Sequence, residues 1–114
     1  MEDCLFCSII AGKIPSAKVY EDEHVYAFRD INPQAPVHVL IVPREHLTDA
    51  KALNGEKALV AAKVFEAVGR IAEQEGVSET GFRVITNCGH DGCQSVQHLH
   101  FHLLGGKQLS EKMD

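Results

Sequence analysis

Polar and apolar residues alternate strictly from position 98 to position 103, in the order His-Leu-His-Phe-His-Leu. Successive side chains of a β-strand point to opposite faces, so the pattern predicts a strand over 98–104 with three imidazoles on one face. Leu99, Phe101 and Leu103 would face a core on the other side. A neutral imidazole can act as a nucleophile, a proton carrier or a metal ligand near neutral pH. The row of histidines therefore predicts a functional site.

Four further segments read as strands, and a loop separates two of them. The segment 37–42 is apolar on both faces, which indicates a central strand with His38 as its single polar residue. The segment 30–36 contains two prolines and an asparagine, so it predicts a loop. The strands are expected at 18–20, 25–29, 37–42 and 82–87.

A long amphipathic helix is expected over 55–75, with Asn54 as its N-cap and Gly76 just beyond its end. A short helix is expected over 5–11. Three strands, the long helix and two more strands then predict an α+β fold, with a five-stranded antiparallel sheet and the helix packed on one face. The apolar stripe of the long helix consists of Ala61, Val64, Phe65, Val68, Ile71 and Ala72.

Length and charge narrow the class of protein. The 114 residues fit one domain, 1–114, and the net charge of −5 without a run of Lys or Arg argues against binding of a nucleic-acid polymer. The first residues are acidic, and no apolar stretch resembles a signal peptide or a membrane span, so we expect a cytoplasmic protein without a membrane partner. Four cysteines in such a protein indicate free thiols or metal ligands.

The loop 88–95 contains two glycines and would present backbone N–H groups, together with the Ser95 hydroxyl, beside the histidines. Such groups can bind a phosphate, while His100 in the middle of the row can attack phosphorus. A zinc site is the competing interpretation, because His-x-His on a strand is half of a carbonic-anhydrase-type ligand set.

The pattern from His98 to Leu104 resembles the signature of the histidine triad (HIT) superfamily of nucleotide hydrolases and transferases. The similarity is closest to the Hint-like branch, the purine nucleoside phosphoramidases, and covers nearly the whole chain. Further matching segments are 28–36, His38, 42–46, the Asn87-x-Gly-x-Asp-Gly-x-Gln-Ser-Val96 stretch and Gly105-Gly106.

The resemblance implies a role for each matching position. His100 would be the nucleophile that takes up the nucleoside monophosphoryl group and passes it to water, without a metal. His102 and Ser95 would contact the phosphate or the leaving group, and His38 would support them. Asp30 would bind the ribose hydroxyls. The remaining nucleotide contacts would come from Leu5, Phe6, Phe28 and Ile31 at the base, and from Asn87, Gln94 and Val96 near the phosphate.

The resemblance also implies a structural zinc ion bound by Cys4, Cys7, His46 and His98, a normal closed ligand set. The alternative is that both cysteines are free and His98 only orients His100. Cys88 and Cys93 depart from the Hint-like pattern and could bind a metal with His90. The family further implies a homodimer with a ten-stranded sheet. The tail from Lys107 to Asp114 lacks the aromatic residue of many relatives, which leaves the leaving-group preference open.

The leading hypothesis is therefore a hydrolase that cleaves purine nucleoside phosphoramidates or related nucleoside monophosphate conjugates through a nucleotidyl-histidine intermediate. A nucleotide-binding adaptor protein with incidental catalysis is the first alternative. A metal-dependent hydrolase that uses the histidine row as ligands is the second. The sequence does not choose between adenine and guanine.

Overall fold

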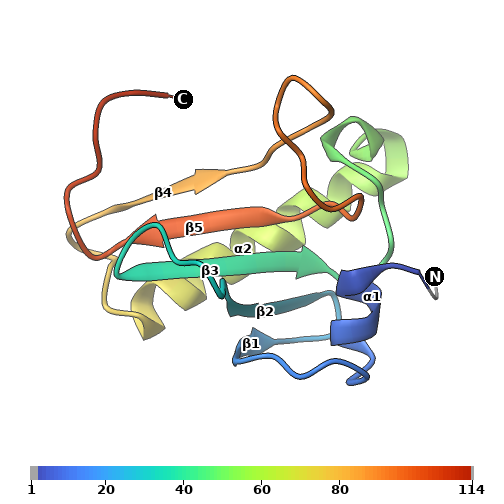
Figure 1. Cartoon of the computed structure of the whole chain (residues 1–114), viewed down its shortest axis with the longest axis horizontal. Coiled ribbons are helices and arrows are strands. Elements are labelled where there is room, and N and C mark those ends of the chain that lie inside the picture. The colour runs from blue at the N-terminus through green and yellow to red at the C-terminus, as the bar shows by residue number, and fades with distance from the viewer. Residues whose placement is uncertain (1–2, 114) are drawn as a thin grey trace.

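The computed structural model describes residues 3–113, which form five strands and two α-helices in the predicted order (Figure 1). Two 3₁₀ turns, Ala50–Ala52 and Gly55–Lys57, precede the long helix. No helix in this part of the chain is long and apolar enough to cross a membrane. The elements are α1 Leu5–Ile10, β1 Lys18–Glu21, β2 Val25–Arg29, β3 Val37–Pro43, α2 Ala58–Gln74, β4 Phe82–Ile85 and β5 Phe101–Gly105.

All five strands pair antiparallel in one sheet with the order β1-β2-β3-β5-β4. The apolar strand β3 lies in the middle, as predicted, and β5 lies beside it. β4 therefore occupies an edge, and the C-terminal tail turns back toward it (Figure 1). The sheet thus brings residues from the first third of the chain next to the histidine segment near its end.

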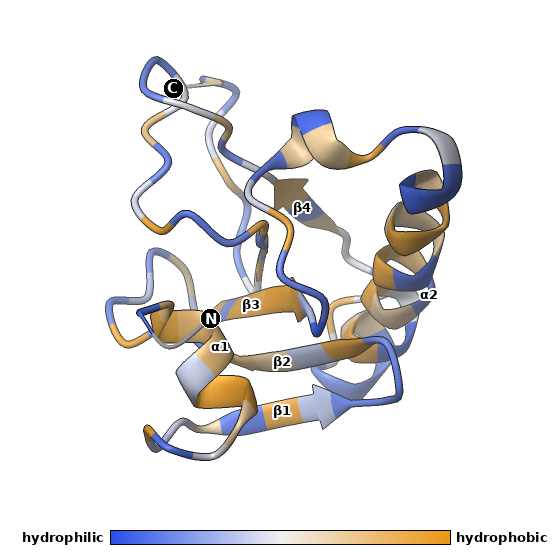
Figure 2. Ribbon diagram, turned by 90° about the vertical axis from the view of Figure 1, so that its right-hand side faces the viewer, coloured by the Kyte–Doolittle hydropathy of each residue, from blue (hydrophilic) through white to orange (hydrophobic). Residues whose placement is uncertain are grey.

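The two faces of the sheet are covered unequally, with α2 on one side and α1 on the other (Figure 2). The side under α2 holds the larger core, to which β3 contributes Val39 and Ile41. The apolar residues that alternate with the histidines, Leu99, Phe101 and Leu103, belong to this same core. The other side holds a smaller cluster of Phe6, Ile9, Phe28, Leu40 and Val42. The histidines lie on this second side, so the predicted alternation of faces is confirmed.

The predicted strand over 98–104 is wrong at its start, because β5 begins at Phe101. The Leu99 amide donates to the Leu47 carbonyl at 2.6 Å, which draws the chain away from β3 before the ladder begins. The backbone at His98 and His100 is thereby free of the β3 ladder while their side chains still face the α1 side.

The long helix also begins later than predicted. Gly55 has a φ of +54°, and the Asn54 side chain forms no capping hydrogen bond, so the segment 55–57 is a 3₁₀ turn and α2 starts at Ala58. Gly76 has a φ of +74° just beyond the helix, as expected for a residue that ends it. β4 ends at Ile85, which leaves Asn87 in the loop that follows.

Candidate active site and metal site

His100 lies at the centre of the histidine row and is only 4% exposed. Its Nδ1 lies 2.7 Å from the His98 carbonyl oxygen. A carbonyl oxygen only accepts hydrogen bonds, so Nδ1 carries the proton and Nε2 keeps its lone pair. Burial lowers the pKa of His100, which favours this neutral form. The arrangement leaves a buried imidazole nitrogen that can act as a nucleophile.

At one end of the row, His102 forms a hydrogen-bonded pair with His38. His38 Nε2 lies 2.9 Å from His102 Nδ1, and the Gln34 backbone N–H donates to His38 Nδ1 at 3.0 Å. Neutral His38 must therefore carry its proton on Nε2 and donate it to His102. His102 then presents its own proton on Nε2. Asp30 completes the group, with a carboxylate oxygen 3.4 Å from His38 Nε2.

Burial holds both imidazoles of this pair in the neutral form. It lowers the pKa of His38, against the opposing charge of Asp30. Burial, with smaller contributions from His100 and His38, lowers the pKa of His102 to about 4. A protonated His102 would therefore be a strong proton donor, and a bound phosphate anion would favour that protonated form.

At the other end of the row, His98 meets the two N-terminal cysteines. His98 Nδ1 lies 3.3 Å from Cys4 Sγ and 3.5 Å from Cys7 Sγ, and His46 Nδ1 lies 3.3 Å from Cys7 Sγ. The four ligand atoms lie within 4.8 Å of one another. His98 Nε2–H donates to the Pro43 carbonyl at 2.8 Å, so the Nδ1 lone pair points to the sulfurs. The four residues fit a tetrahedral zinc ion.

A second group of potential ligands, Asp30, His38 and His102, also lies within 4.8 Å, but it fits a metal poorly. A metal on His38 Nε2 would require the proton to move to Nδ1. The Gln34 amide already donates to Nδ1, and two donors cannot share that bond. We therefore interpret this group as a hydrogen-bond chain.

The loop between β4 and the histidine segment is held by its own side chains. Asn87 Nδ2 donates to the Gly92 carbonyl at 2.6 Å. Gln94 accepts from the Gly89 amide and donates to the Thr48 and Val96 carbonyls. The side chain of Gln94, which was predicted to contact the nucleotide, thus forms its hydrogen bonds to backbone groups that hold the loop. Ser95 is exposed.

The predicted base contacts divide into two pairs. Leu5 and Ile31 are 45% and 93% exposed, whereas Phe6 and Phe28 are buried. The Phe6 ring packs edge-on against His100, with ring centroids 5.0 Å apart, and against Phe28 at 5.5 Å. Leu5, Ser95 and Val96 line a cavity of about 620 Å³ together with the candidate metal ligands Cys4 and His46.

The structure also adds contacts that the sequence did not reveal. Thr86 Oγ1 donates to the His100 carbonyl at 2.8 Å, and the Gln34 amide fixes the tautomer of His38. The Gln34 contact uses a backbone N–H, which every non-proline residue has, so its residue type gives no signal.

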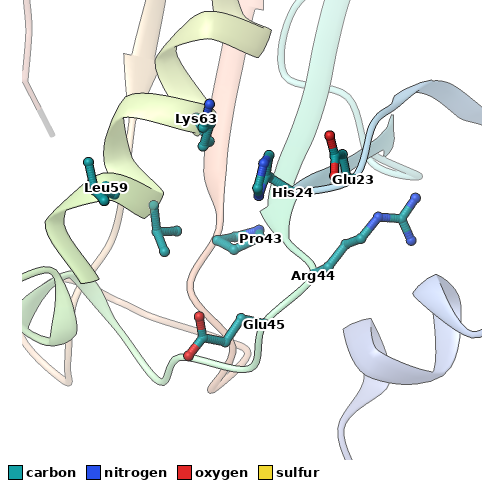
Figure 3. Close-up of a pocket in the computed structure, with 8 residues that line it drawn as sticks. Glu23, His24, Pro43, Arg44, Glu45, Leu59 and Lys63 are labelled. Carbon is teal, nitrogen blue, oxygen red and sulfur yellow. The ribbon is translucent and has the colours of Figure 1, made fainter. Parts of the chain in front are cut away.

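A separate depression of about 240 Å³ lies between the start of α2 and the end of β3 (Figure 3). Leu59, Pro43 and Lys63 line it, and it contains none of the predicted site residues. Arg44 points away from Leu59 and Lys63 in this view, and its guanidinium donates to Glu21. This depression lies apart from the histidine row.

Comparisons with known proteins agree with these features. The family profile of the HIT domain matches residues 11–109. A purine nucleoside phosphoramidase of Escherichia coli (strain K12) is 44% identical over 108 residues, covering 95% of this chain and 91% of that protein. A 14 kDa zinc-binding protein of Zea mays is 47% identical, covering 93% of this chain and 84% of that one.

A solved structure agrees with the fold as a whole. The structure of a HIT family hydrolase from Clostridium thermocellum superimposes with a TM-score of 0.96 at 48% sequence identity, covering 99% of this chain and 98% of that one. With the profile match and the relatives, this similarity shows that the chain belongs to the HIT family, as a hydrolase of its Hint-like branch.

Proposed function

We propose that the protein hydrolyses purine nucleoside phosphoramidates, or related nucleoside monophosphate conjugates, through a nucleotidyl group carried on His100. The observation that carries this proposal is the hydrogen bond from His100 Nδ1–H to the His98 carbonyl. This hydrogen bond places the proton on Nδ1, so the lone pair of the buried neutral imidazole lies on Nε2, which faces the site. The E. coli relative, a purine nucleoside phosphoramidase, supports the substrate class.

The reaction divides into two displacements at phosphorus. In the first, His100 Nε2 attacks the α-phosphorus, a phosphorus–nitrogen bond to the ring forms, and the bond to the leaving amine breaks. The amine leaves with a proton from the protonated His38–His102 pair. In the second, water attacks phosphorus, the bond to Nε2 breaks with its electrons returning to the ring, and the proton lost by water returns to the pair. The sum is one nucleoside monophosphate and one amine.

Binding of the nucleoside is assigned to the β2 side of the row. Asp30, at the end of β2, would accept hydrogen bonds from the ribose hydroxyls. Phe28, Leu5, Phe6 and Ile31 would enclose the base. Ser95, Asn87, Val96 and the backbone of the loop would contact the phosphate, while Gln94 would act by holding that loop in place.

We further propose that Cys4, Cys7, His46 and His98 hold a structural zinc ion, which supplies no step of the reaction. The ion would tie α1 to the segment in front of β5. The name of the Zea mays relative, a zinc-binding protein, supports this assignment. Burial and the neighbouring Cys4 raise the pKa of the Cys7 thiol, and a bound cation would offset that effect by favouring the thiolate.

A homodimer is also part of the proposal. Leu59 and Phe65 on α2 are 69% and 54% exposed, and β4 is an edge strand. Pairing of β4 with its copy would satisfy the edge and extend the sheet to ten strands, while the two α2 helices would cover their apolar side chains. We keep a cytoplasmic location, with neither nucleic-acid polymer nor membrane as partner, as expectations from charge and composition.

The intermediate gives the direct test. The protein is mixed with an adenosine phosphoramidate, quenched within milliseconds and digested, and the peptides are analysed by mass spectrometry. We expect one nucleotidyl group on the peptide that contains His100, and none in a His100→Asn variant. A His90→Asn variant is the control, since His90 is fully exposed. An adaptor protein would bind the nucleotide but form no adduct, and that outcome would contradict the proposal.

A further inference from the structure

Two cations, Arg83 and Lys107, form no ion pair with a carboxylate in the part of the chain that the structure describes, residues 3–113. Most other Lys and Arg side chains there do: Lys18, Arg29, Arg44, Lys51, Lys57 and Lys63 each face a carboxylate oxygen. Arg83 instead donates one N–H to the Ser110 carbonyl at 2.6 Å, which leaves its other donors available. Lys13, Arg70 and Lys112 also form no such pair among the described residues, but Arg83 and Lys107 stand out because they line one cavity together.

The strand register places Arg83 beside His102. His102 of β5 lies opposite Ile85 of β4, and Arg83 lies two residues before Ile85. Residues two apart on a strand share a face, so Arg83 stands on the same face as His102 as its diagonal neighbour. Diagonal neighbours lie about 7–8 Å apart, within reach of a long side chain. The same register aligns His38, Leu104 and Arg83 across three strands.

Arg83 and Lys107 line one cavity of about 520 Å³ with Gln34 and residues 108–110 of the tail. No Asp or Glu lines this cavity. Gln34 connects it to the site, because its backbone N–H donates to His38. The cavity therefore borders the proton-donating end of the histidine row.

The order of the strands decides which part of a substrate would enter this cavity. The proposed nucleoside contacts lie on β2, just beyond it, and on α1, where Phe6 packs with Phe28 of β2. Arg83 lies on β4, with β3 and β5 between it and β2. A phosphorus atom held at His100 would have its nucleoside toward β2. In-line displacement places the leaving group on the side opposite to the attacking nitrogen, and His102 is proposed to protonate that group. The β4 side then remains for its outer part.

Resting on the proposed function, we propose that Arg83 and Lys107 form a subsite for a negatively charged group on the leaving side of the substrate. A guanidinium binds a carboxylate or a phosphoryl group through paired N–H donors, and an ammonium adds a point charge. The subsite would select conjugates whose amine carries such an anion over conjugates whose amine is neutral.

The test uses two substrates that differ in one charge. The adenosine phosphoramidates of β-alanine and of β-alaninamide have the same phosphorus–nitrogen bond, but only the first has a carboxylate. For each we would measure kcat/KM in the wild-type protein and in Arg83→Gln, Lys107→Gln and Lys13→Gln variants. We expect the ratio of carboxylate to amide substrate to fall about tenfold in Arg83→Gln, by less in Lys107→Gln, and not in Lys13→Gln. Lys13, an exposed cation in the segment between α1 and β1, controls for net charge.

A second measurement separates this proposal from the reaction itself. Titration calorimetry would measure binding of both conjugates to a His100→Ala protein with and without the Arg83 and Lys107 substitutions. The ratio of the two affinities reports on the subsite without any need for turnover. Failure to hydrolyse either substrate would overturn the proposed function alone. A ratio of carboxylate to amide substrate that stays unchanged in both Arg83→Gln and Lys107→Gln, in turnover or in binding, would overturn the subsite. The Lys107 variant is included because loss of Arg83 also removes its hydrogen bond to the tail.

Discussion

The two ends of the histidine row present the same kind of side chain in different arrangements, and the difference is set by one hydrogen bond at each end. His98 donates from Nε2 to the Pro43 carbonyl, so its Nδ1 lone pair faces two sulfurs. His38 accepts the Gln34 amide at Nδ1, so its Nε2 must donate to His102. The first arrangement suits a cation, and the second suits proton transfer. The backbone group that contacts each ring, rather than the identity of the residue, decides its chemistry.

The largest expected effect falls on the ring between the two ends. Replacement of His100 by Ala should reduce kcat by several powers of ten, because it removes the nucleophile. Affinity for a nucleoside monophosphate should change little, since the proposed ribose and base contacts lie elsewhere. Steady-state kinetics and calorimetry on one preparation would show both. A variant that keeps more than a tenth of wild-type turnover would exclude His100 as the nucleophile.

The next largest effect concerns the thiol end. The purified protein should contain about one zinc ion per chain, and a Cys4→Ser/Cys7→Ser variant should contain none. Loss of the ion should lower the melting temperature by several degrees or more, because metal binding adds to folding free energy. Activity should fall only modestly.

Elemental analysis, with melting curves recorded before and after chelation, would check this expectation. Cys88→Ser/Cys93→Ser is the matched control, and it should keep both the metal and the melting temperature. If the purified protein contains no metal, and the Cys4→Ser/Cys7→Ser variant melts like the wild type, then these two cysteines are free thiols and not zinc ligands.

The imidazole end should make stability depend on pH. Burial lowers the pKa of His102 from its ordinary value of 6.5 to about 4 in the folded protein, so between these values the unfolded chain binds more protons. The free energy of unfolding should then rise with pH across this window, by up to about 3 kcal/mol from this group. Urea unfolding of metal-free protein from pH 4.5 to 7.5 would measure the slope. A His102→Gln variant should show a shallower slope; an unaltered one would mean that His102 is not buried in its neutral form.

The smallest expected effect is on ribose binding. Replacement of Asp30 by Ala should weaken nucleotide binding by about 1.5–3 kcal/mol, the value of hydrogen bonds to a charged partner. It should also remove the preference for ribose over 2′,3′-dideoxyribose. Parallel binding curves for the two sugars would decide the matter, and an Asp91→Ala variant, which changes an exposed loop carboxylate, serves as control. Equal discrimination by wild type and variant would exclude Asp30 as the ribose ligand.

Periodicity predicted much of the fold, because burial imposes it. The alternation around His100 and the uniformly apolar segment 37–42 both reflect faces of the sheet, and both predictions hold. The start of β5 did not follow from the pattern, since it depends on a hydrogen bond from Leu99 to Leu47, far away in the sequence. Likewise, the delayed start of α2 depends on the positive φ of Gly55.

Features of the site that depend on residue type could be predicted from the sequence. Features that depend on contacts with distant parts of the chain could not. The four proposed metal ligands come together as the resemblance implied. The tautomer of His38, by contrast, depends on a backbone amide, and the place of Arg83 beside His102 depends on strand register. Neither the tautomer nor the position of Arg83 can be recognised from the residue types in these segments.

Phe6 lies between Cys4 and Cys7 in the chain, and its ring packs against both His98 and His100. The thiol end of the row and its centre therefore share the Phe6 ring as a wall, and binding of an ion at one and of a nucleotide at the other would be thermodynamically linked through it. If an ion at the thiols stabilises the position of this ring, then a nucleotide that prefers the same position must increase the affinity for the ion by the same factor. With both proposed ligands bound, this four-residue segment would make the affinity for the metal depend on the substrate, and the affinity for the substrate depend on the metal.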